Sequence, residues 1–241
     1  MKYVERDYRN RVKVKGLLTF HVSVKETDLW VSAEGDYTGK TAHIVHDLRY
    51  KLEGYISAHP EFFTTLTPWP DDPFAPAIIR DMISCSKTAR VGPMAAVAGA
   101  VAQHAAHGLR GSSRQIIIEN GGDIYMDISR DATISIYAGR SPLSHRIGIR
   151  IPEKMMPVGV CSSSGRVGHS LSMGDSDVVC VIAKSATLAD AAATALGNTV
   201  KTKKDLEKLS AKAQEIEGVL GGVAIMDKEM SAWCEVELKL L

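Results

Sequence analysis

The 241-residue sequence predicts an α+β fold of mixed β-sheets packed with Ala-rich helices. Expected strands and helices are mixed along the chain and do not strictly alternate, which favours α+β over a doubly wound parallel sheet. In addition, two Ala-rich helices, at residues 94–107 and 186–196, each lie next to an apolar strand in the sequence. Because the apolar content does not change across the Pro-rich stretch 61–76, we expect residues 1–241 to form one domain.

Composition excludes several classes of protein. Hydrophobic residues make up 45% of the chain, which is enough for a substantial core. The net charge of +1 gives no electrostatic reason to expect nucleic acid or an anionic membrane as a partner. The charged start of the chain lacks the apolar region of a signal peptide, and no run is long enough to span a membrane. The four cysteines lack metal-finger spacing, so we expect free thiols in a cytoplasmic protein.

The first third of the chain predicts a hairpin followed by helices. Residues 12–24 alternate between apolar and polar, and residues 29–33 return after a polar turn, which is the pattern of a β-hairpin. Helical spacing of apolar residues follows over 36–57, and His59-Pro60 ends that helix. Residues 77–89 are the next expected helix. His43 and His46 could share a helix face, but no carboxylate stands at metal spacing beside them.

The expected helix at 94–107 carries a stripe of small residues, and Gly92-Pro93 opens it. The stripe consists of Ala95, Ala98, Gly99, Ala102 and Ala106. One interpretation is close packing of this helix on a sheet. The other is that the entrance at residues 90–93 presents free N–H groups to an anion.

A glycine pair interrupts the next strand pattern. Residues 116–118 read as a buried strand, Asn120-Gly121-Gly122-Asp123 breaks it, and 124–128 resumes an alternating strand. The break could contact a ligand, since Asn120 and Asp123 flank flexible backbone. It could equally be a plain hairpin turn, since a Gly-Gly pair can form one.

The remaining elements complete the α+β pattern. Strands are expected at 132–137 and 145–151, and an amphipathic helix at 206–220. Two further strands are expected near the end, at 221–226 and 232–240.

The stretch 158–198 combines the groups best suited to chemistry. A small-residue loop at 161–165 leads to His169, a buried strand covers 177–184, and a helix follows. In that helix Asp190 and Thr194 are four residues apart, so both oxygens share a face and could bind Mg²⁺. The structural alternative is that Thr187 and Asp190 form a pair resembling a capping box at the helix start.

His169 and Cys161 are the candidate catalytic residues. His169 lies among glycine and serine residues and could exchange protons near neutral pH. Cys161 could be a thiolate nucleophile if a positive neighbour lowered its pKa, or simply a small buried apolar residue. The serines that follow Cys161 lack the strand–GxSxG–helix context of a serine hydrolase.

Three motifs together resemble one known family. Asn120-Gly121-Gly122-Asp123, then Ser163-Ser164-Gly165 with His169, then residues 189–196 (ADAAATAL) occur in the order and approximate separation of the ApbE family. GPMAAVAGA, ENGGDIY and CSSSGRVGHS resemble its compact cytoplasmic subfamily in particular. The resemblance covers residues 92–198 and implies an ApbE-like fold. Members of that family are flavin transferases, which hold FAD with Mg²⁺ and move FMN onto a threonine of a target protein.

The resemblance also implies roles for individual residues. Asp190 and Thr194 would be metal ligands. Asn120, Gly121, Gly122 and Asp123 would line the flavin-nucleotide site, and the loop formed by Ser163, Ser164, Gly165 and His169 would lie beside the phosphates or the transferred group. The expected partners are thus a small-molecule nucleotide and a target protein.

Two alternatives stay open at this point. The chain could be a thiol- or sulfur-handling enzyme that uses Cys161 on the same scaffold. It could also be a nucleotide-binding module without catalytic activity.

Overall fold

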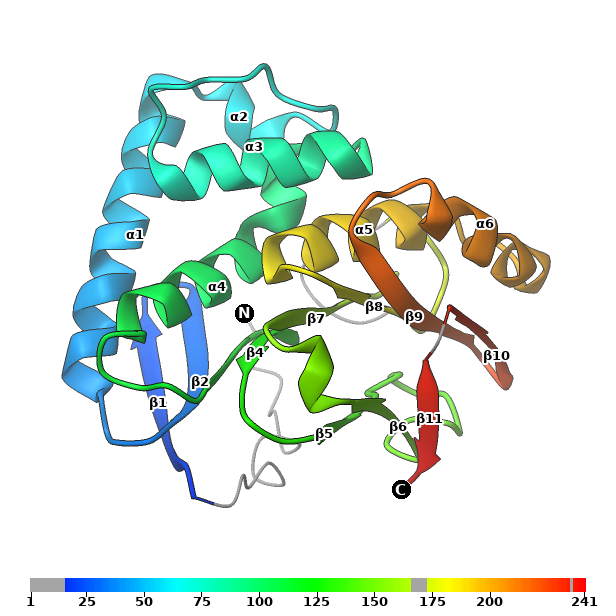
Figure 1. The fold of residues 1–241 in the computed structure, drawn as a ribbon. Helices are drawn as coiled ribbons and strands as arrows, with labels where there is room; N and C mark the ends of the chain where they lie inside the picture. Colours follow the sequence, from blue (N-terminus) through cyan, green and yellow to red (C-terminus); the bar gives the residue numbers. More distant parts are fainter. Residues whose placement is uncertain (1–15, 166–172, 235) are drawn as a thin grey trace.

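The protein contains two antiparallel sheets in the described part of the chain, which in this computed structural model covers residues 16–165, 173–234 and 236–241. Eight described strands form the large sheet in the order β1-β2-β3-β4-β7-β8-β9-β10, and three form the small sheet in the order β11-β6-β5 (Figure 1). The strands are β1 (Leu18–Val24), β2 (Thr27–Ala33), β3 (Ile116–Asn120), β4 (Asp123–Asp127), β5 (Ala132–Ser135), β6 (Ile147–Ile151), β7 (Val158–Ser163), β8 (Val178–Ala183), β9 (Val219–Met226), β10 (Glu229–Trp233) and β11 (Glu237–Leu240). The predicted α+β class is confirmed.

Helices are inserted at a few points of this strand order, mainly between β2 and β3 and between β8 and β9. The α-helices are α1 (Thr38–Ala58), α2 (Glu61–Thr64), α3 (Ala77–Ala89), α4 (Val97–Leu109), α5 (Ala186–Asn198) and α6 (Leu209–Gln214). Short 3₁₀ helices are η2 (Pro93–Ala96), η3 (Glu153–Met155) and η4 (Lys203–Lys208). The two Ala-rich helices of the sequence are therefore α4 and α5.

The large sheet is covered on both faces. In Figure 1, α4 and α5 lie over one face, with α3 packed above them, while β5, β6 and β11 lie over the other. Ile116 and Ile118 enter the core under the helices, and Ile117 between them enters the core shared with the small sheet. A strand buried on both faces needs apolar residues at every position, which explains the uninterrupted apolar runs in β3 and β8.

Two predicted elements near the C-terminus are wrong in extent. The helix predicted at 206–220 is only η4 followed by the short α6, because the chain turns at Gly218 (φ 90°) and β9 begins at Val219. The strand predicted at 232–240 is two strands in different sheets, since the chain bends at Cys234 (φ 59°). Alternating apolar residues continue across this bend, so the pattern alone could not reveal it.

The predicted loop at 161–165 also needs correction. Residues 161–163 are the end of strand β7, which pairs with β4 on one side and β8 on the other. Ser162 and Ser163 lack the apolar residues of a strand pattern, so the sequence did not indicate this part of the strand. The difference matters for function, because a strand fixes which side chains lie on the helix-covered face.

Candidate functional site

Three candidate side chains lie on the helix-covered face of the large sheet. Asp123 begins β4, and Cys161 and Ser163 lie near the end of the adjacent strand β7. Successive side chains of a strand alternate between faces, so Asp123 shares the face of Tyr125, which belongs to the core under the helices. Ile124 pairs with Val160, which makes Asp123 and Cys161 neighbours across the two strands. The sheet thus brings together two segments that the sequence separates.

The glycine pair forms the turn between β3 and β4. Gly121 and Gly122 have φ values of 69° and 111°, and Asn120 pairs with Asp123 across the turn. Positive φ at both central residues is typical of a two-residue hairpin turn, so the hairpin interpretation of this break is confirmed. The Asn120 amide donates to the carbonyl of Ala98 at 3.0 Å, which ties the hairpin to the start of α4.

Asp190 reaches from α5 to the start of α4. Its Oδ2 accepts a hydrogen bond of 2.9 Å from the backbone N–H of Gly99, in the first turn of α4. The first N–H groups of a helix have no partner within the helix and favour negative charge. The Asp190 carboxylate therefore caps another helix, and it is not part of a capping box: the N-cap of α5 is Ser185, whose hydroxyl accepts from Leu188 N–H.

The carboxylates of Asp190 and Asp123 oppose one another electrostatically. Burial raises the pKa of Asp190 well above its usual range, and the charge of Asp123 raises it further, against the opposing effect of the Gly99 and Ala98 N–H groups. Asp123 is itself buried and accepts a hydrogen bond of 3.2 Å from Ser162 N–H. A buried and a half-buried acidic group that repel one another form a site that a divalent cation would stabilise.

The hydroxyl groups of Ser163 and Thr194 are the other candidate side-chain oxygens of this region. The Ser163 hydroxyl is buried and has no hydrogen-bond partner among the described residues. Leaving a buried hydroxyl unpaired costs about 1–3 kcal/mol, so a ligand that supplied a partner would recover that energy. Thr194 is half-buried one helical turn beyond Asp190 on α5.

The rest of the predicted serine–glycine loop lies beyond the end of β7. Gly165 N–H donates to the carbonyl of Ser176 at 3.1 Å, and a Cβ at Gly165 would come within 1.8 Å of the Gly174 carbonyl oxygen. Ser164 directly follows the strand. His169 lies outside the described residues, so its predicted catalytic role stays a prediction.

Cys161 is fully buried under α5. Its thiol donates to the carbonyl of Ala186 at 3.3 Å. Burial raises the pKa of the thiol well above its usual range, and the charges of Asp123 and Asp190 act in the same direction. These properties favour a protonated thiol that packs between sheet and helix, and they give no support to a thiolate nucleophile.

Sequence reasoning missed how α4 takes part in the site. Ala98 supplies a carbonyl to Asn120, and Gly99 supplies an N–H to Asp190. A Cβ at Gly99 would lie 2.2 Å from the carbonyl oxygen of Ala186, so the small-residue stripe permits the close approach of α5. The stripe was the available signal, but the prediction placed a sheet against it, whereas the close approach at Gly99 is to helix α5.

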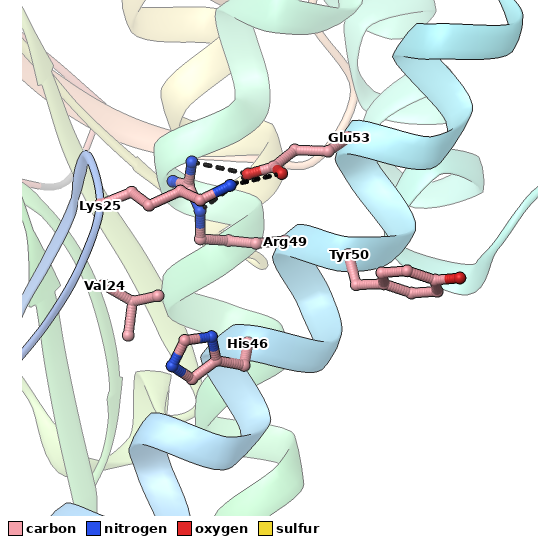
Figure 2. Close-up of a pocket in the computed structure, with 6 residues that line it drawn as sticks. All are labelled: Val24, Lys25, His46, Arg49, Tyr50 and Glu53. Carbon is pink, nitrogen blue, oxygen red and sulfur yellow. Dashed lines mark hydrogen bonds and ion pairs between the residues drawn. The ribbon is translucent and has the colours of Figure 1, made fainter.

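A pocket of about 310 Å³ lies elsewhere, between the β1–β2 hairpin and α1 (Figure 2). Its charged groups pair with one another: Lys25 Nζ donates to Glu53 at 2.7 Å, and Arg49 Nη2 donates to the same carboxylate at 2.8 Å. Val24, His46 and Tyr50 complete the lining shown in Figure 2. With its charges already paired, this pocket offers a ligand little beyond open space.

The site as described offers the kinds of oxygen ligand that a hard cation takes. Carboxylate and hydroxyl oxygens are ligands that Mg²⁺ prefers, with water and ligand phosphates completing its shell. Within residues 16–165, 173–234 and 236–241 no group of three or more His, Cys, Asp and Glu side chains could hold a metal. Oxygens from hydroxyls, backbone or ligand would therefore complete the coordination. No described helix is both long and apolar enough to cross a membrane.

Comparison with known sequences reveals close relatives. A family model described as AbpE bacteria matches residues 9–228. A UPF0280 protein of Methanococcus vannielii is 40% identical over 208 residues, which cover 85% of this chain and 84% of that protein. A UPF0280 protein of Methanocella arvoryzae is 36% identical over 216 residues, which cover 89% and 88% of the two chains.

Comparison with solved structures indicates the same fold. The apo flavinyl transferase ApbE of Pseudomonas stutzeri superposes with a TM-score of 0.60 at 15% identity, covering 90% of this chain and 94% of that one. An ApbE protein of Thermotoga maritima gives a TM-score of 0.59 at 12% identity, covering 91% and 97%. At such identities the likeness shows the fold, and the chemistry must be argued from the site.

Proposed function

The chain belongs to the family described as AbpE bacteria, and from this premise we propose that it binds FAD together with Mg²⁺ and transfers FMN to a target protein. The observation that carries the proposal is the convergence of Asp123 and Asp190 on one partly dehydrated site. The activity for which the Pseudomonas stutzeri protein is named, that of a flavinyl transferase with the same fold, supports it independently.

Each candidate residue has a role in this proposal. Asp190 and Thr194 hold Mg²⁺, with Asp123 beside them, and the cation offsets the repulsion between the carboxylates. Bound Mg²⁺ supplies charge neutralisation for the phosphates of the nucleotide. Ser163, whose buried hydroxyl lacks a partner among the described residues, donates to a phosphate oxygen, with Ser164 and Gly165 following it. Asn120, Gly121 and Gly122, at the β3–β4 turn, line the nucleotide site.

The transfer itself needs a nucleophile from outside the chain. A hydroxyl of the target protein attacks the phosphorus of the FMN half, the pyrophosphate P–O bond breaks, and AMP leaves with the electron pair. His169 is the proposed group that exchanges the proton of that hydroxyl. We further propose that residues 1–241 act as one domain in the cytoplasm, where the four free cysteines would remain reduced.

The test is a titration of FAD into the purified protein, with Mg²⁺ or with EDTA, followed by mass spectrometry of the products. We expect Mg²⁺-dependent binding that Asp190→Asn weakens by about 100-fold, because one carboxylate of the cation site is lost. The asparagine oxygen can still accept from Gly99 N–H, so this variant keeps the helix contact. Asp47→Ala, at an exposed ion pair with Lys51 on α1, is the matched control and should bind normally.

Other outcomes distinguish the alternatives. Equal binding of FAD by the wild type and Asp190→Asn, or no binding by either, would remove the proposal. Binding without release of AMP, in the presence of hydroxyl acceptors, would favour a nucleotide-binding module. Activity that depends on Cys161, tested with Cys161→Ser, would favour the thiol-handling enzyme despite the raised pKa of that thiol.

A further inference from the structure

A buried polar cluster joins α3, α4 and α5 beside the site, and the sequence motifs do not include it. At its centre Asp81 Oδ2 accepts from Thr187 Oγ1 at 2.7 Å and from Gln103 Nε2 at 3.1 Å. His104 Nε2 lies 3.1 Å from the same oxygen, and the Cys85 thiol lies 3.6 Å from Oδ1. Gln103 and Thr187 are buried. One carboxylate thus organises donors from three helices.

The Asp81 carboxylate remains ionised in this cluster. Burial alone would raise its pKa, but hydrogen bonds from His104 and Thr187 outweigh that effect and hold the pKa below its usual value. An ionised carboxylate accepts hydrogen bonds and cannot donate them. Asp81 therefore selects the amide end of Gln103, which leaves the other end of that side chain free for a different partner.

Gln103 uses its second end to fix the start of α5. Its Oε1 accepts a hydrogen bond of 2.8 Å from the N–H of Ala186, the first residue of that helix. A glutamine rotated by half a turn about its last bond would present its NH₂ group to the same N–H and lose this bond. The acceptor oxygen of Asp81 thereby orients Gln103 so that it can hold α5.

This contact forms a pair with the one made by Asp190. Gly99 N–H on α4 donates to Asp190 on α5. One turn further along α4, Gln103 accepts from the N–H of Ala186, which lies one turn before Asp190 on α5. The two hydrogen bonds therefore fix both the contact point and the axial position of two antiparallel helices. A shift of α5 by one residue would move Asp190 by about 1.5 Å along the axis and rotate it by about 100°.

We propose that Asp81 and Gln103 are positioning residues, which set α5 against α4 so that Asp190 and Thr194 face Asp123. This inference rests on the proposed function for its effect on ligand binding, whereas its effect on the helix contact is independent of any ligand. Misplacement of a ligand by about 1 Å can cost a hundredfold in rate or affinity, so a hydrogen bond remote from the cation can matter.

The test exchanges the hydrogen-bond acceptor at position 81 and the donor at position 103. Gln103→Glu sets two carboxylates at the same contact, whereas Asp81→Asn alone keeps an oxygen that can still accept from the NH₂ group of Gln103. The double variant Asp81→Asn/Gln103→Glu restores one donor and one acceptor, and the glutamate still accepts from Ala186 N–H. The Thr187 hydroxyl can reverse its role from donor to acceptor, and so can the neutral His104 ring.

Two measurements are made on each variant at a temperature where it is folded. Amide hydrogen exchange reports the N–H groups of Gly99 and of Ala186, and titration reports the affinity for FAD with Mg²⁺. We expect Gln103→Glu to exchange faster at both amides and to bind about 10- to 100-fold more weakly, as is usual for residues that orient metal ligands, and Asp81→Asn alone to stay near the wild type. The double variant should return both values toward those of the wild type.

Gln115→Glu is the matched control, because Gln115 also accepts from a backbone N–H, that of Ser129, at the other end of β3. It should leave amide exchange at Gly99 and Ala186 unchanged. A Gln103→Glu variant that loses thermal stability but keeps wild-type exchange at these two amides would overturn the proposal, as would a double variant no better than Gln103→Glu. If the wild type binds no FAD, the proposed function fails, and amide exchange alone still decides the positioning role.

Discussion

Among single residues, Asp123 and Asp190 are two acidic groups of the candidate site that repel one another when both are ionised. Asp190 is half-buried and hydrogen-bonded, yet its pKa is raised by burial and by the charge of Asp123. The ionised form is thus less stable in the folded protein than in the unfolded chain. Such an arrangement costs stability in the free protein and favours a cation when one binds.

This repulsion predicts an inverted dependence of stability on pH. Because the folded pKa of Asp190 lies above the unfolded value of about 3.9, the folded state binds more protons between the two values, and its contribution to stability falls as pH rises through that window. Asp190→Asn removes the titration. In EDTA without FAD, we expect this variant to be more stable than the wild type at pH 7 and nearly equal at pH 3.

Chemical denaturation across this pH range measures the effect. Asp123→Asn provides the reciprocal control, since it removes the other half of the repulsion and should also stabilise the cation-free protein. A wild type that is more stable than Asp190→Asn at pH 7 would contradict the interpretation of Asp190 as a strained carboxylate.

At the scale of elements, the contact between α4 and α5 is the central one. Gly99 lets the two helices approach closely, since a Cβ there would lie 2.2 Å from the Ala186 carbonyl oxygen. Asp190 accepts a hydrogen bond from Gly99 N–H and Gln103 accepts one from Ala186 N–H, so both bonds join the same two helices. Two Ala-rich helices can approach this closely because neither carries bulk at the crossing.

Gly99→Ala should therefore destabilise the protein although alanine is the better helix former. The added methyl would lie 2.2 Å from the Ala186 carbonyl oxygen, and such overpacking costs about 1–3 kcal/mol. Gly54→Ala is the matched control: Gly54 lies in α1, where an added methyl would have nothing within 4 Å, so that change should stabilise by about 1 kcal/mol. Urea unfolding of both variants measures the difference. A Gly99→Ala variant as stable as Gly54→Ala would show that the helices separate at little cost.

Elements with one strong periodicity were predictable from the sequence. The buried strands β3 and β8 have short apolar runs of strand length, and the helices α1, α3 and α5 have longer segments with helical spacing. The end of β7 was not predictable, because serine and glycine give no apolar signal. The bend at Cys234 was not predictable either, since the alternation continues through it.

The site was predictable in part and for a different reason. Resemblance to a family's motifs indicated Asp123, Ser163 and Asp190, which the fold does bring to the start of α4 or the adjacent sheet face. The partners of these residues were not predictable. Asp81 and Gln103 are separated from α5 by more than 80 residues, and no local pattern relates them to Ala186 or Thr187.

At the scale of the whole molecule, the chain fills both faces of the large sheet with its own side chains. One core lies under the helices, and the other lies between the two sheets. Neither core depends on the carboxylates of the candidate site. The fold should therefore form without a cation, and a bound cation should add only the stability that its own binding supplies.

Removal of divalent cations should accordingly leave thermal unfolding almost unchanged. In the absence of FAD, we expect the Tm in EDTA to lie within about 2 °C of the Tm in Mg²⁺. FAD with Mg²⁺ at about 100 times its Kd should add about 2.7 kcal/mol of stability by linkage. Scanning calorimetry measures both effects, and a large loss of Tm in EDTA alone would instead indicate a structural metal.

The hydrogen bond between Gly99 and Asp190 joins residues 91 positions apart, and this has a consequence during synthesis on the ribosome. At about 5–20 residues per second, the start of α4 waits roughly 5–20 s for its acceptor to be translated. Over that interval the nascent chain can pair β3 with β4 under α4, but the inner face of β7 and β8 has no α5 to cover it. Helix α5, the last described part of the site to be synthesised, therefore also covers the core beneath it. Until α5 is complete, the chain exposes apolar surface of the kind that chaperones bind.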